Sequence, residues 1–156
     1  MKLYLKQRVF TWGDRFTVYD EAGADRFYVE GEVFTFGKKL HLLDTDGREL
    51  LFIEQQLLTF RPRYSILEGD RELAEVRKEF SLFTPYYTVA GPNWSVEGDF
   101  FDHTYEVKAG DRTVAAVYKE WFTFGDAYAI DVAPDADLLL ALATVLVIDA
   151  CLDDKN

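Results

Sequence analysis

A short phrase recurs along this chain and limits what the chain can fold into. Each copy has an aromatic or apolar residue, Thr and an aromatic residue, then a turn pair, then alternating apolar residues. The copies are residues 10–18 (FTWGDRFTV), 34–42 (FTFGKKLHL), 58–66 (LTFRPRYSI) and 122–130 (FTFGDAYAI). Such a pattern predicts strand, turn and strand. Repetition of it predicts one antiparallel meander.

Turn signals at short intervals extend this prediction to the whole chain. Gly, Pro, Asn and Asp punctuate runs that are rich in Val, Ile, Phe, Tyr and Thr, and we expect about twelve strands. A looser fifth copy of the phrase sets Tyr87 and Val89 on Tyr128 and Ile130. No linker or change of composition divides the 156 residues, so we expect a single domain over residues 1–156.

The C-terminal segment predicts the one helix, from about Asp135 to Leu152. Asp135 or Asp137 can cap its start, and the run LLLALATVLVIDACL that follows is apolar on every side. Such a helix must be buried, and it is shorter than the about 20 residues that cross a membrane. A barrel of about twelve strands can hold a helix roughly 10 Å across. The alternative is a two-layer α+β sandwich with the helix on one face.

The barrel prediction makes specific residues of the helix inaccessible. Leu139, Leu142, Leu146 and Val147 should be nearly inaccessible to solvent. Asp149 interrupts the apolar run, so we expect it to anchor the helix at the barrel mouth. Cys151 is the only cysteine of the chain, and its apolar and acidic neighbours indicate a structural thiol.

Three features together resemble a known family. They are the repeated VEG-x-x-F element at residues 29–34 and 96–101, the hairpin turn Asp44-Thr45-Asp46-Gly47, and the closing apolar helix. The chain resembles the LURP-one-related proteins, including their bacterial YxjI-like group, within the tubby C-terminal-like superfamily that also holds the phospholipid scramblases. The resemblance implies a mainly β fold, a twelve-stranded antiparallel barrel enclosing a buried C-terminal helix. Tubby-type domains bind phosphoinositide head groups through Lys and Arg on adjacent strands, but none of those residues aligns individually with this chain.

Charge limits the possible ligands. The net charge is −11, and residues 81–156 hold 4 Lys or Arg against 13 Asp or Glu, so binding of nucleic acid by a general field is not expected. Residues 1–80 hold 13 cations against 15 acids. Among those cations, Lys38, Lys39, Arg61 and Arg63 lie at turns of repeated hairpins, where they could form a cationic rim for lipid phosphates. The alternative is that they only solubilise these loops.

Catalytic and metal-binding patterns are weak. The serines lack a G-x-S-x-G context, and His41 and His103 are each isolated in sequence. Asp99, Asp102 and His103 are the best metal candidates, but their spacing matches no metal site, so no metal or cofactor is predicted. We therefore expect a non-catalytic module that binds phospholipid, phosphoinositide or a membrane surface. The alternative is a protein-interaction or stress-related scaffold without lipid binding.

Location follows from the same features. The first residues contain no apolar core of signal-peptide length, and no apolar run is long enough to span a membrane. We expect a cytoplasmic protein, not transmembrane, that could meet a membrane peripherally. Its expected partners are anionic lipid head groups or another protein.

Overall fold

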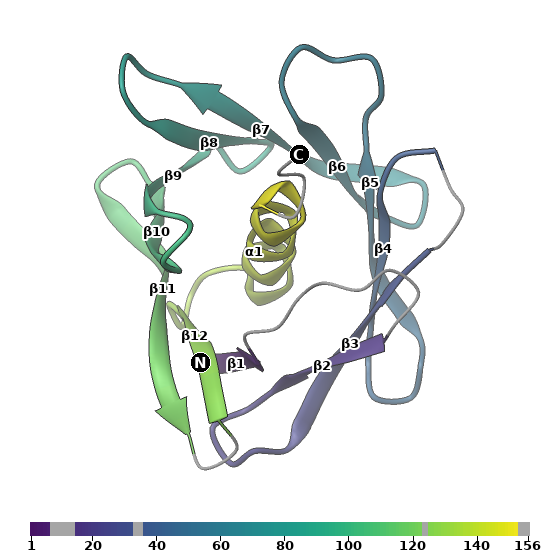
Figure 1. Ribbon diagram of the computed structural model, residues 1–156. Helices are drawn as coiled ribbons and strands as arrows, with labels where there is room; N and C mark the ends of the chain where they lie inside the picture. The colour runs from purple at the N-terminus through teal and green to yellow at the C-terminus, as the bar shows by residue number, and fades with distance from the viewer. Residues whose placement is uncertain (7–14, 33–35, 123–124, 153–156) are drawn as a thin grey trace.

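The computed structural model of the protein describes residues 1–6, 15–32, 36–122 and 125–152. It is a β-barrel with one helix in its centre (Figure 1). The elements are β1 (Lys2–Lys6), β2 (Arg15–Tyr19), β3 (Asp25–Gly31), β4 (Lys39–Leu43), β5 (Glu49–Gln55), β6 (Arg63–Glu68), β7 (Arg71–Phe80), β8 (Pro85–Ala90), β9 (Trp94–Asp99), β10 (Thr104–Ala109), β11 (Arg112–Phe122), β12 (Gly125–Val132) and α1 (Leu138–Leu152).

The sheet is a closed antiparallel meander. Each strand from β2 to β11 pairs with the next one in sequence, and β1 lies between β12 and β2. β1 pairs with β12 over five positions, from Lys2 opposite Asp131 to Lys6 opposite Ala127. Closure leaves no free sheet edge. The predicted barrel around a helix is therefore confirmed, and the sandwich alternative is wrong.

The meander sorts the connections between strands into two ends of the barrel. At the end where α1 finishes lie the described parts of the β3–β4, β5–β6, β7–β8 and β9–β10 connections, residues 32, 36–38, 56–62, 81–84 and 100–103, which we call the helix-exit rim. At the opposite end lie residues 20–24, 44–48, 69–70, 91–93, 110–111 and 133–137, the helix-entry rim. The turn pairs Gly37-Lys38 and Arg61-Pro62 fall at the helix-exit rim. Residues 10–14, 34–35 and 123–124, which also belong to copies of the phrase, lie outside the described residues.

Helix α1 fills the barrel. Leu142 and Val147 have no accessible surface, and Leu146 has almost none, as predicted. The prediction for Leu139 is wrong, because this side chain is only partly buried. Leu139 belongs to the first turn of the helix, where the strands at the open end of the barrel no longer enclose it on all sides.

The helix begins at Leu138, three residues after the first predicted cap. Asp137 is the N-cap: its Oδ1 accepts a hydrogen bond from the Leu140 amide at 3.1 Å, and its carbonyl accepts one from Ala141. Asp135 instead pairs with Arg112. No helix among the described residues is long and apolar enough to cross a membrane.

Candidate functional site

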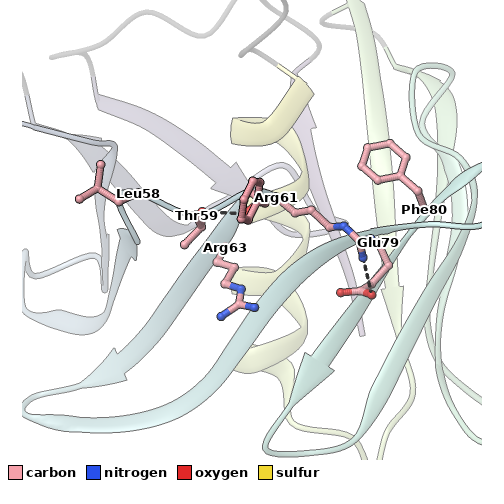
Figure 2. Close-up of a pocket in the computed structure, with 7 residues that line it drawn as sticks. Leu58, Thr59, Arg61, Arg63, Glu79 and Phe80 are labelled. Atoms are coloured by element: carbon pink, nitrogen blue, oxygen red, sulfur yellow. Dashed lines mark hydrogen bonds and ion pairs between the residues drawn. The ribbon is translucent and has the colours of Figure 1, made fainter.

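An open depression of about 730 Å³ lies at the helix-exit rim (Figure 2). The β5–β6 connection, the first residue of β6 and the end of β7 form its walls. Its lining is Leu58, Thr59, Phe60, Arg61, Arg63, Glu79 and Phe80. Two guanidinium groups thus lie beside three large apolar side chains, in a site that is open to solvent.

Arg61 crosses the depression. Its Nη1 donates a hydrogen bond to Glu79 Oε2 at 3.2 Å, and its guanidinium lies 6.0 Å from the centre of the Phe80 ring. The Thr59 hydroxyl donates to the Arg61 carbonyl at 2.7 Å, which fixes the loop. Because a guanidinium has five N–H donors and this side chain is about half exposed, a single ion pair leaves donors for a phosphate.

Arg63 begins β6 and stands opposite Arg77 in the β6–β7 ladder. Arg77 donates to Glu75, which also accepts a hydrogen bond from Gln56 at 2.7 Å. Burial alone would raise the pKa of Glu75, but the hydrogen bonds from Gln56 and Arg77 and the charges of Arg77 and Arg63 lower it. One carboxylate therefore partly neutralises two neighbouring guanidinium groups.

The predicted cations separate into two groups. Lys38 Nζ donates to the Ala150 carbonyl at 2.7 Å, so its ammonium caps the end of α1, where the helix dipole is negative. Lys39 is partly buried on β4, opposite Glu54. Only Arg61 and Arg63 line the depression. All four lie at or beside the helix-exit rim, but they do not form one continuous cluster.

The three predicted metal candidates point to different partners. Asp102 accepts a hydrogen bond from Lys119 at 2.9 Å, and Asp99 accepts one from the Asp102 amide at 3.1 Å. His103 stacks on Tyr128, with ring centres 4.4 Å apart, and its Nε2 lies 3.5 Å from Asp149. In the described part of the chain, no three His, Cys, Asp or Glu side chains are placed to hold a metal ion.

Asp149 anchors the end of α1 to the barrel wall. It accepts a very short hydrogen bond from Tyr128, and its charge also acts on Tyr87 and Tyr105. Burial, followed by the charge of Asp149, raises the pKa of Tyr105 and Tyr128 far above the usual value. Burial raises that of Tyr87 too, helped by the adjacent Cys151. Cys151 is buried.

The layer of inward tyrosines was not predicted from the sequence, although the repeated phrase contained its signal. Tyr64 and Tyr128 follow the turn of their copies at the same position, and Tyr87 takes this position in the looser copy. All three are buried, each from an even-numbered strand. The repeat therefore places tyrosines at one level around the end of the helix.

His41 is held on the outer surface between two carboxylates. Its Nε2 lies 2.6 Å from Glu32, and its Nδ1 contacts Glu49. Partial burial would lower the pKa of His41, but the hydrogen bonds and charges of Glu49 and Glu32 together raise it. With both ring nitrogens held by carboxylates, His41 has a structural role and is not a free general base.

Comparison with known proteins gives one family and a consistent set of relatives. The model of the LURP-one-related family matches residues 1–149. The uncharacterised protein YxjI of Bacillus subtilis (strain 168) is 33% identical over 152 residues, which cover 97% of this chain and 94% of that protein. An X-ray structure of an Arabidopsis thaliana protein matches with a TM-score of 0.73 at 21% identity. The match covers 97% of this chain and 90% of the plant chain, which supports the fold alone.

Proposed function

The chain belongs to the LURP-one-related family, and from this premise we propose that it is a non-catalytic module that binds anionic phospholipid head groups at the helix-exit rim. It would act as a cytoplasmic protein that meets the membrane peripherally. The observation that carries the proposal is the depression in which Arg61 and Arg63 lie beside Leu58, Phe60 and Phe80.

The chemistry of this depression suits a ligand that carries a phosphate next to an apolar group. Guanidinium groups bind phosphate oxygens through paired N–H donors, and the neighbouring aromatic rings provide an apolar surface. Arg63 and Arg77 stand opposite each other on β6 and β7. The like charges are only partly offset by Glu75 and Glu79, so an additional anion would be favourable here.

The filled interior supports a non-catalytic role. Ligand sites of barrels usually occupy the interior or its mouth, and here α1 occupies the interior with buried side chains from Leu140 to Ile148. At the mouth, Asp149, His103 and Tyr128 bind one another. These groups serve the anchoring of the helix and leave no paired nucleophile and base in that cluster.

Sedimentation with vesicles tests the proposal. We expect binding to vesicles of phosphatidylcholine and phosphatidylserine, weaker binding as salt increases, and none to phosphatidylcholine alone. Arg61→Gln with Arg63→Gln should lose about 2 kcal/mol, or roughly 30-fold in affinity, because each cation contributes about 1 kcal/mol near an anionic surface. Lys38 is unsuitable for this test, since its ammonium caps α1.

The matched control changes two arginines near the helix-entry rim. Arg48→Gln with Arg71→Gln removes the same charge from exposed positions at the other end of the molecule, so affinity should stay unchanged. Equal losses from both pairs would mean that only net charge matters. Absence of sedimentation even at low salt would contradict the proposal and favour the protein-interaction scaffold.

A further inference from the structure

The helix-exit rim carries large apolar side chains that are exposed to solvent. Among the described residues, every exposed large apolar side chain except Met1 lies in this rim or at the end of β7. The five most exposed have between 89% and 109% of their surface accessible. They are Phe36, Leu58, Phe60, Leu82 and Phe83. Single exposed apolar residues are normal in proteins, but a group confined to one end requires an explanation.

The local conformations at these positions are unfavourable for apolar residues. Leu82 and Phe83 occupy the tip of the β7–β8 turn, closed by a hydrogen bond from the Ser81 amide to the Thr84 carbonyl at 3.0 Å. Such tips are normally Gly, Asn, Asp or Ser. Leu58 has a φ of +59°, a conformation that costs a non-glycine residue free energy. Neither feature contributes to the core, so fold stability does not account for them.

The exposed side chains belong to neighbouring loops. A Cβ added to Gly37 would lie 2.9 Å from Leu57, so the β3–β4 and β5–β6 connections touch. Arg61 and Lys78 both lie within about 6 Å of the Phe80 ring centre, which links the β5–β6 connection to the β7–β8 hairpin. The three connections that carry these apolar tips are therefore neighbours at the rim, with Arg61 and Lys78 beside them.

The opposite end of the barrel, the helix-entry rim, is acidic. The turns of the helix-entry rim, all of them described, hold Arg48 as their one Lys or Arg. Their acidic residues are Asp20, Glu21, Asp44, Asp46, Asp70, Asp111, Asp135 and Asp137. An anionic surface would repel this end and attract the other, so the charge distribution orients the molecule.

We propose that the apolar tips of the helix-exit rim insert into the interfacial layer of an anionic bilayer, with Arg61 and Arg63 at the level of the lipid phosphates. The inference rests on the proposed function and names its partner, an intact bilayer and not a soluble phosphorylated ligand. Apolar side chains fit the acyl boundary of a bilayer. Cations beside them fit its layer of anionic phosphates. Side chains that project singly from loop tips present no preformed surface to a folded protein.

Depth-dependent fluorescence quenching tests the insertion. Phe83→Trp places a fluorophore on the rim, and Asp46→Trp places one in an exposed turn at the opposite end as the matched control. The emission of each, after subtraction of the native protein, is measured on phosphatidylserine-containing vesicles whose acyl chains carry bromine. We expect the rim tryptophan to shift to the blue and be quenched, and the control to be unaffected.

A second pair of substitutions separates insertion from charge. Phe60→Ser with Phe83→Ser should weaken vesicle binding about tenfold or more without changing the thermal unfolding temperature, because neither side chain packs in the fold. If the protein sediments with anionic vesicles but the rim tryptophan is not quenched, insertion is wrong while the proposed function stands. If the protein does not sediment with anionic vesicles at low salt, both the insertion and the proposed function are wrong.

Discussion

At the scale of single residues, the second copy of the VEG element, residues 96–98, is explained by a close approach of two strands at its glycine. Gly98 lies on β9 opposite Tyr105 of β10, with a φ of +143°. A Cβ at Gly98 would lie 2.5 Å from the Thr104 carbonyl oxygen and 2.6 Å from the Tyr105 Cα. Both are backbone atoms and cannot move without separating the two strands. This copy of the element therefore marks a close approach of β9 and β10.

Replacing Gly98 by Ala should destabilise the protein by about 3 kcal/mol or more, since backbone strain and a steric clash act together. Gly23→Ala is the matched control, because Gly23 also has a positive φ but has no atoms within 4 Å of an added Cβ. It should cost roughly 1 kcal/mol. Urea unfolding of both variants measures the difference. Equal losses of stability would show that the close approach of β9 and β10 at Gly98 does not add to the cost of the substitution.

At the scale of elements, α1 is the clearest case of a structure that the sequence could predict. A run that is apolar on all sides and too short for a membrane leaves burial inside the protein as its physical solution. The helix is accordingly buried from Leu140 to Ile148. Its first turn could not be predicted, because the exposure of Leu139 depends on where the surrounding strands end.

Substitution of Leu142 and of Leu139 tests directly how the burial of side chains differs along α1. Leu142→Ala should cost about 3 kcal/mol, because a fully buried leucine leaves a cavity in the centre of the barrel. Leu139→Ala, the same substitution at a partly buried position of the same helix, should cost less than half as much. Chemical denaturation provides both values. Similar losses at the two positions would contradict the enclosure of the helix, and Leu142→Asp should prevent folding altogether.

The arrangement of the elements also explains why the candidate site was only partly predictable from the sequence. The repeated phrase implied that Arg61 and Arg63 share an end of the barrel with Lys38 and Lys39, and the meander places them so. The contact of Lys38 with Ala150 joins residues 112 positions apart, which no local pattern encodes. Leu82 and Phe83 look like the continuation of a strand in sequence, so their exposure at a turn becomes visible only in the structure.

At the scale of the whole molecule, the helix and the barrel depend on each other. The strands enclose α1, and its last turn is bound to the β9–β10 and β11–β12 hairpins through His103 and Tyr128. The helix cannot leave without opening the barrel, and an empty barrel of this size would expose its apolar interior. We therefore expect one cooperative unfolding transition for the entire chain.

Alkaline pH tests this cooperativity through the buried tyrosines. Burial and nearby negative charge raise the pKa of Tyr87, Tyr105 and Tyr128 in the folded protein. In the unfolded chain they lose their protons near pH 10. The folded state then binds more protons than the unfolded state, so these groups contribute stability that is fully present below about pH 10 and is lost as the pH rises further.

The free energy of unfolding should fall above pH 10 with a slope of up to about 4 kcal/mol per pH unit, because each of the three tyrosines contributes about 1.4. Tyrosinate absorbance and the helical circular dichroism signal, followed together during alkaline titration, measure the transition. The last part of the rise in absorbance, which comes from the three buried tyrosines among the nine of the chain, should coincide with the loss of helix. Tyr128→Phe, which removes one of the three groups, should reduce the slope by about a third. Ionisation of all three tyrosines at a pH where the helix persists would contradict a closed barrel around α1, since solvent would then reach the end of the helix in the folded state.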